Sequence, residues 1–485
     1  MTDRSFGWWT RPTSAELFDI TNRGDLLELQ YRYRGTRRAL FYEVLGHATD
    51  LGARSVVAEY RYLDADYRNE HSLFYSTTFR RYPSVAHRLH FFADRLPDDI
   101  LDNKKPSRFD QFNYLGYAVI RPVPAGPVGR TLLPPADGVR PYVSCSTSEE
   151  VNLFGARLTA TGAPFMTQES QLGVCVHITA WVCAYYHHLE FQGGRFLPGE
   201  IAALAPHEVG RLVPIPARGM SVDQLSSMLE SAGLPPLVYS LDDLPASEDV
   251  FTIACRYLNS GFPVIVAGGG HAFVLVGYEY VIDADGTRRT QFLRHDDQAG
   301  LYLRVENPLL DRYRPWEYLV VPLPPKVYVS GETAEQIGRD WLGEVLHDVG
   351  DTDCVELLER LEKEKVVLRA TAVRSNEFKL ELKGRWAPPD LVAAYQWAQM
   401  SRWAWVVEAV DHDKWAAGER CVEAEVVIDA TDHTGDPRPI AWRIPGQVLI
   451  WNPDLDKVRA HQLGIVGLLG SVSRVGGPPT CNAHA

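Results

Sequence analysis

One cysteine and one histidine in this sequence stand where their side chains could carry out nucleophilic chemistry. Cys175 opens the apolar run CVHITAWVCAYYHH, which predicts a helix from Cys175 to about Phe191 with the thiol in its first turn. Free amide N–H groups and the positive end of the helix dipole stabilise an anion there, and the thiolate is the nucleophilic form of cysteine. His271 opens the strand-like run HAFVLVGY, and its neutral imidazole could take the thiol proton and return it to a leaving amine.

A carboxylate follows on the next predicted strand. The run TQFLRHDD comes one turn after HAFVLVGYEYV, and an antiparallel return of this length would bring Asp296 or Asp297 back beside His271. A carboxylate there fixes the imidazole tautomer and stabilises the imidazolium. We expect Asp297 and His295 to be solvated residues at the strand end. The glycines in GGGHAFVLVGY would leave room for a substrate backbone.

Two glutamines precede the cysteine. Gln168 stands seven residues before Cys175, and Gln171 stands four residues before it. An amide N–H₂ just ahead of the helix could donate to a developing oxyanion, beside the backbone N–H of Cys175. The residue types alone leave the choice between the two glutamines open.

A metal site on the same helix fails on geometry. Cys175 and His177 are two positions apart and point to opposite sides of a helix, so they cannot share one ion with Cys183 and His187. The last two could share an ion but lack further obvious ligands. The glycine run lacks the Lys-Ser/Thr of a P-loop and precedes a strand. We therefore expect no metal and no cofactor.

The composition is that of an ordinary globular protein. Of 485 residues, 45% are hydrophobic and 23% are charged, and the net charge of −13 argues against a nucleic-acid-binding protein. Seven scattered cysteines without CxxC pairs predict reduced thiols in a cytoplasmic protein. The N-terminus lacks the apolar segment of a secretion signal, and the longest apolar run, residues 262–278, is interrupted by proline, glycine and histidine. We expect neither a nucleic-acid nor a membrane partner.

Two stretches rich in proline and glycine, residues 121–141 and 321–332, suggest three domains: 1–130, 131–325 and 326–485. The middle segment reads as helices followed by an antiparallel sheet, which is typical of an α+β fold. Both flanks also read as α+β, and neither contains a second ordered set of catalytic residue types. Further expected elements are helices at 14–20 and 84–96 in the first segment and a strand at 378–384 in the last.

The order of these residues resembles that of papain-like cysteine peptidases. A glutamine, a cysteine at a helix start, further helices, a histidine on one strand and an aspartate on the next follow one another in that family's order. Residues 263–277 closely resemble the histidine strand of the bacterial group related to bacteriocin-leader peptidases. The resemblance covers about residues 140–325.

The resemblance implies a role for each residue. Cys175 would be the nucleophile, His271 the base, Asp296 the orienting carboxylate and Gln168 the oxyanion donor. The implied fold is a papain-like domain, in which the helix carrying the cysteine packs on an antiparallel sheet carrying histidine and aspartate, between two α+β accessory domains. Two features depart from the group: Val-Cys-Val replaces Asp-Cys-Gly around Cys175, and the gap from Gln168 to the cysteine is one residue longer than usual.

The expected function is an intracellular thiol-dependent peptidase that cleaves a peptide or protein through an acyl-enzyme intermediate. The flanking domains would govern substrate access and could hold a regulatory protein. Two other functions stay open. One is acyl transfer to an amine, as in transglutaminase-like or arylamine acetyltransferase-like enzymes, which share the Cys–His–Asp order. The other is a catalytically inert papain-like binding module, against which the intact Cys, His and Asp argue.

Overall fold

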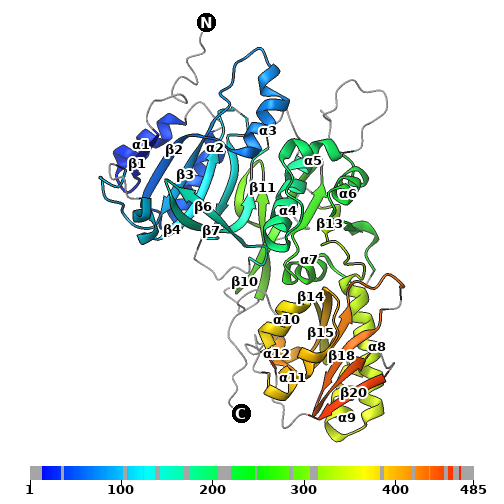
Figure 1. Cartoon of the computed structure of the whole chain (residues 1–485). Helices are drawn as coiled ribbons and strands as arrows, with labels where there is room; N and C mark the ends of the chain where they lie inside the picture. Colours follow the sequence, from blue (N-terminus) through cyan, green and yellow to red (C-terminus); the bar gives the residue numbers. More distant parts are fainter. Residues whose placement is uncertain are drawn as a thin grey trace. The chain divides into compact units, whose positions relative to one another are not determined.

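The chain, seen in a computed structural model, divides into two compact units, and its elements are labelled in Figure 1. Unit 1 comprises Met1–Phe251 and Pro263–Pro324, and unit 2 comprises Thr252–Phe262 and Pro325–Ala485. The structure describes residues 14–33, 38–101, 106–123, 125–136, 143–168, 175–205, 220–245, 248–282, 288–305, 315–382, 387–416, 421–435, 437–452, 457–462 and 469–470.

The first predicted domain boundary falls inside a strand. β5 (Val128–Leu133) contains residues 130 and 131, and it pairs with β4 (Tyr114–Ile120) on one side and β7 (Ala156–Phe165) on the other. One sheet therefore runs through the first two predicted domains. That the chain has three separately folding domains stays a prediction.

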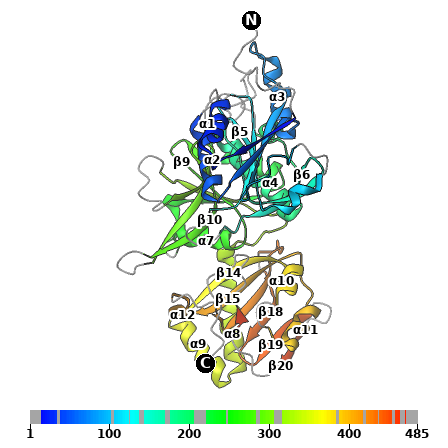
Figure 2. The ribbon, with the colours of Figure 1, turned by 90° about the vertical axis from the view of Figure 1, so that its left-hand side faces the viewer.

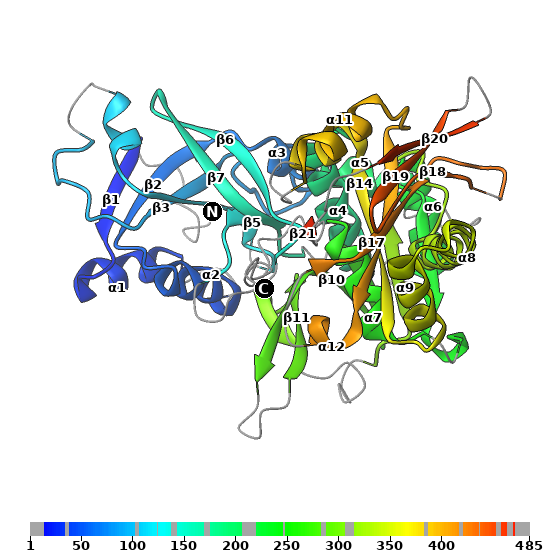
Figure 3. The same ribbon diagram turned by 90° about the horizontal axis from the view of Figure 1, so that it is seen from below.

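The first sheet of unit 1 has seven antiparallel strands in the order β1-β2-β3-β4-β5-β7-β6. Figure 3 shows α1 and α2 along one side of β1, β2 and β3. The remaining elements of this part are β1 (Ala15–Asp19), α1 (Arg23–Arg32), α2 (Arg38–Asp50), β2 (Ser55–Tyr62), α3 (Ala65–Leu73), η2 (Tyr75–Thr77), β3 (Ala86–Phe92), η3 (Pro106–Gln111) and β6 (Thr147–Leu153).

Residues 14–20 and 84–96 were expected to be helices, and they form β1 and β3 instead. The polar residues of β3 are buried, where a helix would have exposed them. Arg88 Nε donates to Glu59 at 2.9 Å on the neighbouring strand, and His90 Nδ1 hydrogen-bonds the Tyr114 hydroxyl at 2.9 Å. These partners come from strands distant in sequence, so tertiary pairing decides the structure of this stretch.

The second sheet of unit 1 carries the residues of the candidate site. It has six antiparallel strands in the order β12-β11-β10-β9-β13-β8. α4 (Cys175–Phe191) contacts β10 and is buried almost all round, as expected for a helix without a polar face. The predicted helix at these residues is confirmed. The strands are β8 (Pro236–Ser240), β9 (Val264–Gly268), β10 (His271–Ile282), β11 (Arg288–Asp296), β12 (Gly300–Val305) and β13 (Tyr318–Pro322).

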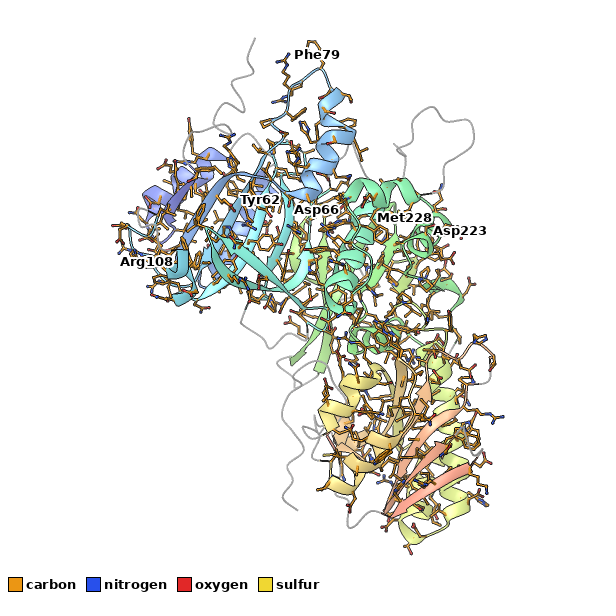
Figure 4. The ribbon with its side chains drawn as sticks, viewed as in Figure 1. Tyr62, Asp66, Phe79, Arg108, Asp223 and Met228 are labelled. Atoms are coloured by element: carbon orange, nitrogen blue, oxygen red, sulfur yellow. The ribbon has the colours of Figure 1, made fainter. Side chains whose placement is uncertain are left out.

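Smaller helices accompany this sheet. α6 (Val222–Ser231) begins with a capping box: Ser221 Oγ accepts from the Gln224 N–H at 3.2 Å, and Gln224 Oε1 accepts from the Ser221 N–H at 3.0 Å. Figure 4 shows Met228 of this helix on the side of α4 and Asp223 on the outer side. α5 (Pro198–Leu204) and η4 (Leu241–Asp243) complete this part.

Unit 2 is a six-stranded antiparallel sheet in the order β14-β15-β17-β18-β19-β20 with helices on both faces (Figure 2). On β15 (Trp403–Asp411) the side chains alternate. Ala404 and Val406 join the core formed with α10 and α11, whereas Val407 faces Gly338 of α8. The other elements are α7 (Val250–Asn259), α8 (Gly331–Val349), α9 (Thr352–Glu362), β14 (Val366–Arg374), α10 (Ser375–Glu381), α11 (Pro389–Trp397), α12 (His412–Ala416), β16 (Cys421–Val422), β17 (Ala424–Asp429), β18 (Pro439–Ile444), β19 (Gln447–Asn452), β20 (Lys457–Gln462) and β21 (Leu469–Gly470).

Helix α7 crosses the limit between the units, and its residues from Thr252 onward belong to unit 2. There Arg256 Nη2 pairs with Glu335 at 2.7 Å, and the Phe262 ring, which follows the helix, packs edge-on against Trp403. A segment that the sequence placed in the middle domain is thus part of the core of unit 2.

Three further findings concern residues 378–384, the cysteines and possible membrane-spanning helices. Residues 378–384 were expected to be a strand, but they begin within α10, where Phe378 and Leu382 are one helical turn apart and both buried. Cys421 is disulfide-bonded, so the expectation that all cysteines are reduced is wrong there. Among the described residues, no helix is long and apolar enough to cross a membrane.

Candidate active site

A two-residue hairpin turn places His271 at the start of β10. His271 pairs with Gly268, so Gly269 and Gly270 form the turn, and their φ angles are 56° and 74°. Two successive positive angles are those of a type I′ turn, which glycine adopts without strain. A Cβ on Gly268 would lie 2.1 Å from the carbonyl oxygen of Pro315. Gly269 and Gly270 therefore serve the turn, and Gly268 allows a close approach of the chain's own backbone; that the glycines also leave room for a substrate stays a prediction.

His271 and Asp296 lie side by side. β11 runs antiparallel to β10 with His295 opposite Val274, so the end of β11 returns to the start of β10. His271 Nε2 is 3.1 Å from Asp296 Oδ1, and the two residues are 8% and 0% exposed. Burial acts to raise the pKa of Asp296, but the hydrogen bond and charge of His271 outweigh it, so the pKa lies below its usual value. Asp296 is thus an ionised acceptor for Nε2–H.

The other two residues of the HDD run are also buried, which corrects the expectation of solvated side chains. Asp297 is 5% exposed and His295 is 3% exposed. The His295 Nδ1 atom bonds the carbonyl oxygen of Pro164 at 2.9 Å, and burial lowers the pKa of His295 to about 3. His295 is therefore a neutral core residue.

Cys175 is the first residue of α4 and is buried, with 8% exposure. Its side chain accepts hydrogen bonds from the backbone N–H groups of Val176 and Ala272, and Ala272 directly follows His271. Burial, and after it the carboxylate of Asp297, raise the pKa of Cys175 to about 11, although the two N–H groups act in the opposite direction. The helix start was expected to favour the thiolate, whereas in this structure the thiol is the resting form.

Gln168 lies beside the turn after β11. Its backbone N–H donates to the carbonyl oxygen of Asp297 at 3.4 Å, and its side-chain oxygen is buried without a hydrogen-bond partner among the described residues. Gln171 lies outside the described residues. The position of Gln168 next to the Asp296-Asp297 pair favours it as the candidate oxyanion donor.

A buried ion pair holds the segment that leads to Gln168. Arg121 Nη1 bonds both carboxylate oxygens of Glu70, at 2.7 and 2.8 Å, and these side chains are 1% and 3% exposed. The other guanidinium nitrogen, Nη2, donates to the carbonyl oxygens of Thr167 at 2.8 Å and Gly126 at 2.5 Å. Four acceptors around the two terminal nitrogens of one guanidinium fix the backbone just before Gln168.

The sequence reasoning missed Gln298. This residue lies in the turn between β11 and β12, where its side-chain Nε2 is 3.3 Å from His271 Nδ1 and its backbone N–H donates to Asp296 Oδ1 at 3.0 Å. The run HDDQAG signals a turn opened by an aspartate, because a carboxylate often accepts from the N–H two residues on. The contact of the side chain with the imidazole leaves no such signal.

His271, Asp296 and Asp297 are the described residues that could hold a metal ion, because one ligand atom of each lies within 4.8 Å of the others. Asp296 already accepts bonds from His271 and Gln298, so it is engaged in the hydrogen-bond network of the site. His177, Cys183 and His187, which were considered as ligands on α4, are buried within that helix and do not belong to this set.

The comparisons with known proteins add little to this description of the site. No family model matches the sequence, and no curated protein matches it. Eight chains of solved structures match, and one of them is that in the crystal structure of UfSP from C. elegans. It is 19% identical over 34% of this chain and 33% of that chain, with a TM-score of 0.22. This chain therefore spans about a third of the UfSP chain, and a likeness at that TM-score carries no argument.

Proposed function

We propose that the protein is a thiol-dependent peptidase in which Cys175 is the nucleophile, His271 the base and Asp296 the residue that orients the base. One observation carries the proposal. The Nε2 atom of a buried histidine is bound to a buried carboxylate at 3.1 Å, and the next backbone N–H along the same strand binds the thiol at the start of α4. These two contacts give the base an orienting carboxylate and bring the thiol to the residue that follows the base, which supports nucleophilic catalysis by cysteine.

The first step moves a proton from sulfur to nitrogen. Asp296 holds the Nε2 proton of His271, so Nδ1 is the basic nitrogen that remains for the thiol of Cys175. The pKa of Cys175, raised to about 11, leaves little thiolate at neutral pH, so proton transfer accompanies attack on the substrate carbonyl carbon. The imidazolium formed is stabilised by the Asp296 carboxylate.

The later steps return the proton. The tetrahedral oxyanion is stabilised by the backbone N–H of Cys175 and by the amide of Gln168, which stays a proposed donor. His271 gives its proton to the leaving amine, the C–N bond breaks, and an acyl-thioester on Cys175 remains. Water, deprotonated by His271, attacks this thioester and releases the second product with the thiol.

The finer parts of the proposal rest on the sequence. Residues 263–277 support a relation to the bacteriocin-leader-peptidase-like group, and a peptide or protein is the substrate class that follows from it. We further propose a cytoplasmic location and a role of the segments outside the site in governing access to it.

The test is a labelling and turnover experiment on the full chain. An electrophilic peptide probe should label Cys175, as mapped by mass spectrometry, and Cys175→Ala should abolish labelling and peptide cleavage while leaving the circular dichroism spectrum unchanged. Cys354→Ala, a change at a buried cysteine of unit 2, is the control and should keep both. The proposal fails if Cys175→Ala retains cleavage.

The same assay separates hydrolysis from acyl transfer. With a primary amine added, a peptidase yields mainly free acid, whereas an acyltransferase yields a stable amide that carries the added amine. If neither product forms and no probe labels Cys175, the inert binding module is the better reading.

A further inference from the structure

The turn between β11 and β12 places one glutamine against both partners of the proposed base pair. Asp296 Oδ1 accepts from the backbone N–H of Gln298 at 3.0 Å and from His271 Nε2 at 3.1 Å. The Ala299 N–H closes the turn by donating to the Asp296 carbonyl oxygen at 3.1 Å. From this turn the Gln298 side chain reaches back, and its Nε2 lies 3.3 Å from His271 Nδ1.

Both ring nitrogens of His271 are therefore occupied in the resting structure. Because Nε2–H donates a hydrogen bond to the carboxylate, Nδ1 carries a lone pair and no proton, and the amide N–H₂ of Gln298 is a donor to that lone pair. That lone pair is the one that must take the proton of Cys175. The amide and the thiol consequently compete for the same atom.

We propose that Gln298 is a positioning residue of the reaction proposed above: its side-chain amide occupies His271 Nδ1 and opposes proton transfer from Cys175 until a substrate displaces the amide. The inference rests on the proposed function, since it gives Gln298 a role only if His271 serves Cys175.

The charge around His271 fits this role. The titratable and charged groups near it are Asp296 and Asp297 on the turn, Cys175 on α4, Arg294 with its Nη2 3.8 Å from Asp296 Oδ2, and Glu317, which accepts from the Gly269 N–H at 3.0 Å. Several carboxylates around one imidazole favour its protonated form. A neutral donor on Nδ1 acts in the opposite direction, because an imidazolium has no lone pair to accept it.

The experiment measures the rate of alkylation of Cys175 by iodoacetamide from pH 5 to pH 10, followed by mass spectrometry of the Cys175 peptide. Gln298→Ala should react about two- to tenfold faster than the wild type near pH 6, as expected from the loss of one hydrogen bond. Gln298→Met keeps the length of the side chain and the backbone N–H but removes the amide donor without adding a charge, so it should react faster to a similar extent. The differences should shrink toward high pH, where Cys175 ionises without the base.

The matched control is Gln336→Ala, an exposed glutamine on α8, which should leave the profile unchanged. A Gln298 variant with the wild-type profile, or one slowed by the same factor at every pH, would overturn the role of Gln298. His271→Ala distinguishes the two proposals. If His271→Ala has the same profile as the wild type, the proposed function itself fails, whereas a changed profile in His271→Ala with none in the Gln298 variants removes only this inference.

Discussion

At the scale of single residues, the reactivity of Cys175 is set by opposing effects. The start of α4 and the backbone N–H groups of Val176 and Ala272 favour the thiolate, but burial and the Asp297 carboxylate favour the thiol and prevail, with a pKa of about 11. The position of Cys175 at a helix start could be predicted from the sequence. Its burial and its closeness to the Asp297 carboxylate could not be predicted, because both depend on how the sheet folds.

Asp297→Asn should lower the pKa of Cys175 below about 11, because it removes a negative charge and keeps the side-chain shape. The sign follows from the anion: a thiolate forms more easily when a neighbouring carboxylate is neutralised. We expect alkylation of Cys175 at pH 8 to quicken by up to about tenfold, the equivalent of one pKa unit. Asp223→Asn, at an exposed position of α6, is the control. A slower reaction in Asp297→Asn would show that Asp297 supports the thiolate.

His271→Ala and Asp296→Ala should reduce peptide cleavage by different factors. Removing the base eliminates proton transfer, so cleavage should fall by about 10²–10⁴-fold. Asp296→Ala should cost less, because Gln298 still holds the ring, and Asp297→Ala should cost least. The measurement is kcat/KM on one peptide for the three variants. An Asp297→Ala loss larger than that of Asp296→Ala would move the orienting role to Asp297.

At the scale of elements, the hairpin of β9 and β10 decides where the base sits. The helix α4 and the strands that carry His271 and Asp296 were predicted, because their apolar patterns are local. Residues 84–96 and 378–384 were misread for opposite reasons. Residues 84–96 contain polar side chains that are buried because they pair across a sheet. Residues 378–384 form a β-like sequence, but two of its apolar residues are spaced by one helical turn.

Gly270→Ala should destabilise the hairpin, since Gly270 has a φ of 74° and an open space around its Cβ position. The cost should be about 1–2 kcal/mol, from the left-handed backbone alone. Cleavage should fall with it, because His271 is the next residue. Gly46→Ala is a matched control in the same unit: it also meets open space but lies within helix α2, so it should stabilise by about 0.5–1 kcal/mol. Chemical denaturation measures both, and equal effects of the same sign would contradict the argument.

At the scale of the whole molecule, the two units should respond differently to acid. In unit 1, burial lowers the pKa of His90 from 6.5 to about 4 and that of His295 from 6.5 to about 3. The unfolded chain therefore takes up these protons first as pH falls. The stability that neutral histidines contribute is complete above pH 6.5 and is lost below it, by about 1.4 kcal/mol per pH unit for each residue until the folded values are reached.

Thermal unfolding of unit 1 should thus move to lower temperature between pH 7 and pH 5. His347 of unit 2 is exposed, with a side-chain exposure of 81%, and its replacement serves as the control. His90→Gln should reduce the pH dependence, and His347→Gln should leave it unchanged. The argument fails if His90→Gln unfolds with the same pH dependence as the wild type.

The division into units also decides how the role of the flanks can be tested. A fragment of residues 131–325 would lose β4, the partner of β5, and would contain the α7 residues without their partners in unit 2. These pairings are distant in sequence, which is why composition alone suggested other boundaries. A fragment that ends near Pro324 and keeps residues 14–130 matches unit 1 more closely.

The path of α7 through both units has a consequence during synthesis. Residues 252–262 leave the ribosome about 140 residues before Trp403 and Trp405, against which Phe262 and Tyr257 pack. At the usual speed of translation this is a delay of roughly ten to thirty seconds. During that time the newborn chain exposes an apolar surface that has no partner yet, so a chaperone that binds nascent chains would find its target in this stretch.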